Sequence, residues 1–262
     1  SVSIAPFRYF VEEISGGTFD VNVMVPPGAS PHIYEPVPDQ IDRLRRSDAY
    51  ISNGLLGFEE TWLDRFYEIN RDMKKISLAG NIDLIESEHH HEGEHSERAD
   101  PHYWVSPLSA FKMASPVKEL LTGLDPGNRQ RYQENHEVLL RKISEVDSMA
   151  RELSSPEGKR AFMIYHPTLG YLARDYGLEE ISFEQEGKEP SPSRLIQLID
   201  RARKENLKVI LVQREYDVRN AQVIANETGA VIKVIDPLSE DWYAATVEII
   251  RVLKDSFEEE PK

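Results

Sequence analysis

The chain has 262 residues, no cysteine and a formal net charge of −15. Its length allows one large domain or two domains of roughly 100 to 150 residues. The negative charge argues against nucleic acid as a partner, because a duplex binder needs clustered Lys and Arg to neutralise phosphates. The lack of cysteine excludes thiolate metal ligands, thiol nucleophiles and disulfides, so any metal site must use histidine and carboxylate ligands.

Short apolar segments alternate with helical patterns in the first half of the chain. The spacing of apolar residues predicts strands over 20–25, 49–52 and 75–78 and helices over 38–46 and 59–69. Such alternation favours βαβ units and a parallel sheet. No segment approaches the roughly 18 to 20 apolar residues of a membrane-spanning helix. Because the sequence opens without a basic and apolar leader, we expect a mature chain from which an export signal has been removed.

One long helix is predicted in the middle of the chain. Asp125 is a typical N-cap, Pro126 suits the first helical position, and no helix breaker follows before Pro156. Residues on one stripe follow at intervals of four and three: Tyr132, His136, Leu139, Ile143, Val146, Ala150 and Leu153. This spacing predicts a helix of roughly 29 residues, about 43 Å long, that acts as a rigid strut. A helical hairpin with an undetected turn is the alternative, and His136 is interpreted as a packed histidine.

The second half of the chain returns to alternating strands and helices. Strands are predicted over 160–165, 208–212 and 230–235, and helices over 168–176, 191–205, 217–228 and 241–257. The predicted fold class is α/β, with two lobes, each a mainly parallel sheet flanked by helices, joined by one long rigid helix. The expected division is an N-terminal lobe over 1–124, the connecting helix over 125–155 and a C-terminal lobe over 156–262.

Four side chains stand where metal ligands are expected. His32 lies beyond the strand 20–25, and His166 and Asp236 directly follow the strands 160–165 and 230–235. In open α/β sheets, ligands bind beyond the carboxyl ends of the strands. With His102, they form a set of three imidazoles and one carboxylate, which suits tetrahedral Zn²⁺, whereas Mn²⁺ usually prefers more oxygen ligands. A single histidine at a strand end is more often structural, so position alone leaves both interpretations open.

A further histidine cluster lies in the segment 86–97, which consists mainly of Glu and His. Because this segment has no residues that could build a core, we expect a mobile loop. Its histidines are His89, His90, His91 and His95. The segment is either a solvated acidic loop or a low-affinity loop that collects metal ions.

Several short motifs occur in an order and spacing that match a known family. They are Ser3-Ile4-Ala5-Pro6, Pro27-Gly28-Ala29-Ser30-Pro31-His32, Asn53-Gly54 with Glu59, Asp100-Pro101-His102-Tyr103-Trp104, Tyr165-His166-Pro167 and Asp236-Pro237-Leu238. With these motifs the chain resembles the metal-binding solute-binding proteins of ABC-type zinc and manganese importers, the ZnuA-like family. The resemblance extends over nearly the whole chain. It implies two α/β lobes joined by a long helix, with the metal held in the cleft between the lobes.

The resemblance also implies a function and a ligand set. The ligands carried over are His32, His102, His166 and Asp236. Manganese-preferring members tend to have Glu at the third position, so His166 favours Zn²⁺, with Mn²⁺ as the alternative ion. The expected function is capture of this divalent ion outside the cytoplasm and delivery to the membrane permease of an ABC transporter. The resemblance implies a monomer that is free in the periplasm or lipid-anchored through a segment outside this chain.

Two other classes of protein stay open. A zinc hydrolase would need an open metal position and a base beside the bound water. The sequence contains no His-Glu-x-x-His, and Glu184 and Glu186 are the only candidates for such a base. A metal-dependent adhesin would use the ion for structure alone. We therefore expect a metal carrier and not an enzyme.

Overall fold

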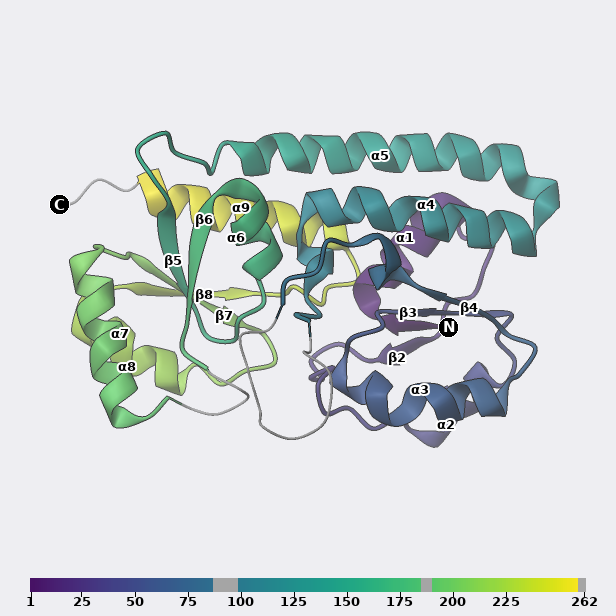
Figure 1. The fold of residues 1–262 in the computed structure, drawn as a ribbon, viewed down its shortest axis with the longest axis horizontal. Coiled ribbons are helices and arrows are strands. Elements are labelled where there is room, and N and C mark those ends of the chain that lie inside the picture. Colours follow the sequence, from purple (N-terminus) through teal and green to yellow (C-terminus); the bar gives the residue numbers. More distant parts are fainter. Residues whose placement is uncertain (87–98, 185–189, 259–262) are drawn as a thin grey trace. The chain divides into compact units, whose positions relative to one another are not determined.

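The computed structural model describes residues 1–86, 99–184 and 190–258 (Figure 1). Two compact units are present. Unit 1 contains Ser1–Trp104, Leu108–Ser144 and Leu238–Trp242, and unit 2 contains Val105–Pro107, Glu145–Pro237 and Tyr243–Lys262. Within the described residues, no helix is long and apolar enough to cross a membrane. The segment 86–97 lies almost entirely outside the described residues, and the domain limits expected at 124 and 155 stay a prediction.

Unit 1 is built on a four-stranded parallel sheet with the order β2-β1-β3-β4. Its strands are β1 (Val2–Ile4), β2 (Val23–Val25), β3 (Ala49–Ser52) and β4 (Lys74–Ser77). The helices α2 (Pro38–Leu44) and α3 (Gly57–Ile69) lie on one face of the sheet, and α1 (Ala5–Ser15) and α4 (Pro107–Leu124) lie on the other (Figure 1). Both faces are covered, which explains why β3 is buried along its whole length. Short 3-10 helices occur at Leu78–Asn81 and Tyr103–Val105.

Unit 2 repeats this topology, with the order β6-β5-β7-β8 and all strands parallel. Its strands are β5 (Arg160–Ile164), β6 (Leu178–Ser182), β7 (Val209–Gln213) and β8 (Val231–Ile235), and its helices are α6 (Gly170–Tyr176), α7 (Pro192–Lys204), α8 (Arg219–Thr228) and most of α9 (Trp242–Glu258). The helix α7 begins as the sequence indicates, because the Ser191 hydroxyl accepts a hydrogen bond from the Arg194 amide at 3.3 Å. The helix α8 ends at Gly229, whose φ of 75° suits glycine.

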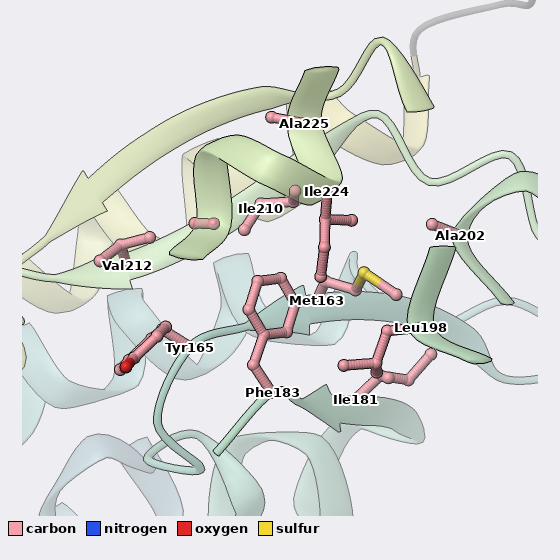
Figure 2. Close-up of a cluster of buried hydrophobic side chains, with 11 residues drawn as sticks. Met163, Tyr165, Ile181, Phe183, Leu198, Ala202, Ile210, Val212, Ile224 and Ala225 are labelled. Carbon is pink, nitrogen blue, oxygen red and sulfur yellow. The ribbon is translucent and has the colours of Figure 1, made fainter. Parts of the chain in front are cut away.

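The core of unit 2 lies between its sheet and the helices α7 and α8. Figure 2 shows Met163 and Ile210 from the strands facing Leu198 and Ile224 from these helices. All four side chains are at most 1% exposed. Burying an apolar side chain of this size stabilises the folded state by roughly 1.5 to 3 kcal/mol. The burial of these four side chains therefore holds the helices against the sheet.

The long helix predicted in the middle of the chain is α5 (Arg129–Arg151). The stripe residues from Tyr132 to Leu153 are all buried, with His136 at 5% exposure the least so, and the helical hairpin is excluded. The first turn at the predicted start, Pro126–Asn128, is 3-10 and leads directly into α5. The side chain of Asp125 holds this turn. Its carboxylate accepts hydrogen bonds from the Asn128 amide at 2.6 Å and the Tyr132 hydroxyl at 2.7 Å.

The shared strand order determines where each unit can bind a ligand. In both sheets the first and third strands of the unit lie side by side, and the second strand lies outside the first. The chain therefore reverses its direction of winding beside β1 in unit 1 and beside β5 in unit 2. Ligand sites of open α/β sheets form beyond the carboxyl ends of the strands at this point. Among the predicted ligands, His32 follows β2, His102 lies between β4 and α4, His166 follows β5 and Asp236 follows β8.

Candidate metal site

Two of the predicted ligands meet within unit 1. The Nε2 atoms of His32 and His102 are 3.2 Å apart, and their ring centroids are separated by 5.2 Å. Two imidazole ligands of a tetrahedral Zn²⁺ with Zn–N distances of 2.0 to 2.1 Å have nitrogens about 3.3 Å apart. The spacing of this histidine pair therefore fits two corners of a tetrahedral zinc site.

The imidazole of His102 is fixed by Asp100. One carboxylate oxygen of Asp100 accepts hydrogen bonds from the backbone amide of His102 at 2.8 Å and from its Nδ1 at 2.7 Å. The His102 side chain is only 6% exposed, which limits competition from water. An Nδ1–H that donates to the carboxylate makes Nε2 the unprotonated nitrogen, which is the form that binds a metal ion.

The segments carrying His32 and His102 are tied to one loop of unit 1. This loop, residues 53–58, connects β3 to the first turn of α3. The Phe58 amide donates to the Pro31 carbonyl at 3.2 Å, next to His32. The Asn53 side-chain amide donates to the Pro101 carbonyl at 3.0 Å, next to His102. The loop that follows β3 therefore holds the segments that carry the two histidines.

In unit 2, His166 directly follows the segment that ends β5. Its Nδ1 lies 3.0 Å from a carboxylate oxygen of Glu184, in the segment that follows the neighbouring strand β6. Both side chains are largely buried, at 12% and 8% exposure. Glu184 therefore acts on His166 as Asp100 acts on His102: it accepts the Nδ1–H and leaves Nε2 available for a metal ion.

The backbone of His166 is held as firmly as its ring. Gln213, at the end of β7, is fully buried, and its side-chain amide donates to the His166 carbonyl at 2.5 Å. The Gln213 side-chain oxygen accepts from the His166 amide at 3.3 Å. The imidazole of His166 also stacks on Tyr216, with centroids 5.2 Å apart and an interplanar angle of 21°. These contacts orient the ring before any ligand arrives.

Asp236 directly follows β8, in the same unit as His166. Its side chain is 31% exposed, and one carboxylate oxygen lies 3.4 Å from Nη1 of Arg214. Because Arg214 is itself 68% exposed, this ion pair is weak and solvent-screened.

The structure brings His32 and His102 together in unit 1 and places His166 and Asp236 at the carboxyl end of the sheet of unit 2. Within that sheet, β7 separates the strands that precede His166 and Asp236. The four histidines of the second cluster, His89, His90, His91 and His95, lie outside the described residues.

Three contributors were not identified as such from the sequence. Asp100 was noticed only as part of a motif, although an Asp two residues before a His is placed to bond both its amide and its ring. Glu184 was considered only as the base of a hydrolase. Gln213 carried one detectable signal, because it is a polar residue that ends an otherwise apolar strand.

The fold and these ligand positions together define a class of protein. Two parallel α/β units of identical topology, with His102 of unit 1 and His166 of unit 2 each held by a carboxylate, have the architecture of a metal-binding solute-binding protein. The family model described as "Zinc-uptake complex component A periplasmic" matches residues 1–255, and the chain belongs to this family. The family consists of solute-binding transport proteins, so the chain is not an enzyme.

Comparison with individual proteins gives the same result. A crystal structure of ZnuA aligns with a TM-score of 0.89 and 36% identity over 97% of both chains. The high-affinity zinc uptake system protein ZnuA of Bacillus subtilis is 28% identical over 97% of this chain and 83% of its own length. The zinc-binding lipoprotein AdcA of Streptococcus pneumoniae is 24% identical over 97% of this chain. The chain spans only 55% of the length of AdcA.

Proposed function

We propose that the chain captures one Zn²⁺ outside the cytoplasm and delivers it to the membrane permease of an ABC importer. Its ligands are His32 and His102 from unit 1 and His166 and Asp236 from unit 2. A shell of four protein ligands is closed, so the bound ion has no open position for a substrate. This suits a carrier, which must hold the ion and not activate water on it.

The observation that carries this proposal is the 3.2 Å spacing of the Nε2 atoms of His32 and His102. A pair of imidazoles alone leaves a tetrahedral ion half coordinated, and unit 2 offers a third oriented imidazole and a carboxylate. A set of three nitrogens and one oxygen favours Zn²⁺ over Mn²⁺, which prefers oxygen ligands. The zinc uptake and zinc-binding relatives agree with this choice of ion.

The test is a competition titration of the metal-free chain with Zn²⁺ and with Mn²⁺ against a chelator of known affinity. We expect one tight Zn²⁺ site per chain and weaker Mn²⁺ binding. His102→Ala and His166→Ala, one from each unit, are each expected to lower Zn²⁺ affinity by 100-fold or more, about 2.7 kcal/mol or more. His136→Leu, which removes a histidine buried elsewhere, is the matched control and should bind as the wild type does.

Tighter binding of Mn²⁺ than of Zn²⁺ would make the chain a manganese carrier. Tight Zn²⁺ binding that survives both alanine substitutions would place the site elsewhere and contradict the ligand set. A loss caused by His102→Ala alone would show that unit 2 contributes no ligand, and the two-unit site would then be rejected.

We also propose that His89, His90, His91 and His95 form a secondary, low-affinity site that collects Zn²⁺. Four imidazoles within seven residues raise the local density of ligands without the fixed geometry of a tight site. Replacing all four by Asn should remove weak extra Zn²⁺ binding and leave the tight site unchanged. Loss of the tight site in this variant would reverse the roles of the two histidine sets.

A further inference from the structure

The loop 53–58 is held in place by one buried carboxylate. Glu59, at the start of α3, is 3% exposed and accepts backbone hydrogen bonds from Asn53 at 2.8 Å and Gly54 at 2.6 Å. It also accepts from the Leu56 amide at 3.4 Å and from the hydroxyl of Ser3, which belongs to β1. Four donors on one carboxylate are more than a helix N-terminus alone requires, because the usual capping interaction satisfies a single backbone amide.

On its other side the loop contacts the backbone of His32 and the two residues that flank His102. A Cβ atom on Gly57 would collide with the carbonyl oxygen of His32, so only glycine allows this approach. Asn53 donates to the Pro101 carbonyl, and its own carbonyl accepts from the Tyr103 hydroxyl at 2.8 Å. Pro101 and Tyr103 flank His102. The same short loop therefore contacts the backbone on either side of the histidine pair.

We propose that the loop 53–58, clamped by Glu59, is a buttress that sets the spacing of His32 and His102 in the metal-free protein. This inference rests on the proposed function, because it assigns positioning residues for the same metal site. Glu59, Asn53 and Gly57 touch no ion. They hold two ligand backbones in place, so that less conformational entropy is lost when the ion binds.

The sharpest test compares two glycine substitutions in unit 1. Gly57→Ala forces the loop away from the His32 carbonyl, whereas Gly80→Ala adds a methyl group where nothing lies within 4 Å. We expect Gly57→Ala to weaken Zn²⁺ binding by about 10- to 100-fold, the range seen when outer-shell support of metal ligands is lost. Gly80→Ala should bind as the wild type does. The visible absorption bands of bound Co²⁺ should shift only in Gly57→Ala, because they report ligand geometry.

A second pair separates positioning from general stability. Glu59→Gln removes the charge that the four donors share. Tyr132→Phe removes the partly buried hydrogen bonds of α5 to Thr18 and Asp125. Both variants should lower the melting temperature of the metal-free chain. Only Glu59→Gln should also shift the Co²⁺ bands and weaken Zn²⁺ binding, by tenfold or more.

Each outcome decides one question. Wild-type chain without tight Zn²⁺ binding would reject the proposed function itself. If the wild type binds Zn²⁺ tightly but Gly57→Ala and Glu59→Gln match their controls in affinity and Co²⁺ spectrum, the role of the loop 53–58 is rejected. The proposed function would then still stand. Equal losses of Zn²⁺ affinity in Glu59→Gln and Tyr132→Phe would show that Glu59 contributes only to general stability. Unchanged Co²⁺ bands in Gly57→Ala would show that the loop does not set the ligand geometry.

Discussion

At the scale of single residues, the site depends on what the second nitrogen of each imidazole does. His102 and His166 both direct Nδ1 to a carboxylate, that of Asp100 at 2.7 Å and that of Glu184 at 3.0 Å. A carboxylate partner fixes the tautomer and orientation of the ring and raises the basicity of Nε2. Sequence alone pointed to His166 because it follows a predicted strand, and to His102 because of its motif. It did not point to Glu184 as the partner of His166, because β6 was not predicted and the proximity of Glu184 to His166 depends on that strand.

Removing the carboxylate partner of His166 should weaken metal binding. We expect Glu184→Ala to lower Zn²⁺ affinity by about 10- to 100-fold, because the imidazole loses its orientation and part of its basicity. Glu184→Gln, which keeps an acceptor oxygen, should lose less. Competition titration at pH 7.5 measures both, with Glu179→Gln as the control, because Glu179 pairs with Arg201 on the edge of the sheet. A Glu184→Ala variant with wild-type affinity would refute this role.

At the scale of elements, the helix α5 was predicted from its apolar stripe, and that stripe is buried as expected. Its exact start was not predictable, because whether Asp125 bonds the backbone or Asn128 and Tyr132 depends on the three-dimensional arrangement. The stripe contains one polar residue, His136. Among the described residues, neither of its ring nitrogens has a hydrogen-bond partner. Such a group destabilises the folded state, and more so when it must carry a charge.

Stability should depend on pH through His136. Burial is the main cause that lowers the pKa of this imidazole below its ordinary value of 6.5, and the charge of Lys118 adds to it, while Glu137 opposes it. As the pH drops below about 6.5, the unfolded chain therefore takes up a proton that the folded chain does not, and the stability of the folded chain falls. The fall levels off below the pKa that His136 has in the folded chain. Above about pH 6.5 the loss of stability is absent.

His136→Leu should remove this dependence and also stabilise the chain by about 1 kcal/mol at pH 7.5, since no buried polar atom is left unsatisfied. Chemical denaturation of metal-free wild type and variant at pH 7.5 and pH 5 measures the effect. The free-energy difference between the two chains should be larger at pH 5. A difference independent of pH would show that His136 does not titrate between the folded and unfolded states.

The helix α7 offers a test of the core of unit 2. Leu198 is 1% exposed and packs in the cluster shown in Figure 2, whereas Ile196 on the same helix is 61% exposed. Leu198→Ala should lower the free energy of unfolding by about 2 to 5 kcal/mol, because it leaves a cavity. Ile196→Ala should change it by less than about 0.5 kcal/mol. Urea denaturation measures both, and similar losses in the two variants would contradict the packing described.

At the scale of the whole molecule, much of the fold was predictable because strands and helices alternate with clear periods. The apolar pattern did not predict β1, α1, α4 or β6. The helix α4 contains an internal proline, Pro116, which reads as a breaker. The strand β6 has the sequence Leu-Glu-Glu-Ile-Ser, and its polar residues suit the edge position that it occupies.

The site was predictable only in part. His32 and His102 are 70 residues apart, and their meeting depends on the order of strands in the sheet of unit 1. Position identified His32 as a candidate because it lies beyond a predicted strand, and segments after strands carry ligands in this fold class. His102 was identified through its motif. Asn53 and Glu59 were noticed only as part of a motif. Their support of the histidine pair was not predicted, because hydrogen bonds to backbone atoms leave no pattern of side chains in the sequence.

The central claim is that side chains from both units coordinate one Zn²⁺. The most direct measurement is X-ray absorption at the zinc edge on the 1:1 complex of the wild type, of His166→Ala and of the variant with Asn at His89, His90, His91 and His95. We predict four nitrogen or oxygen ligands at about 2.0 to 2.1 Å in the wild type, with scattering from three imidazoles. Scattering should fall to two imidazoles in His166→Ala and stay unchanged in the loop variant. An unchanged spectrum for His166→Ala, or loss of imidazole scattering in the loop variant, would contradict the claim.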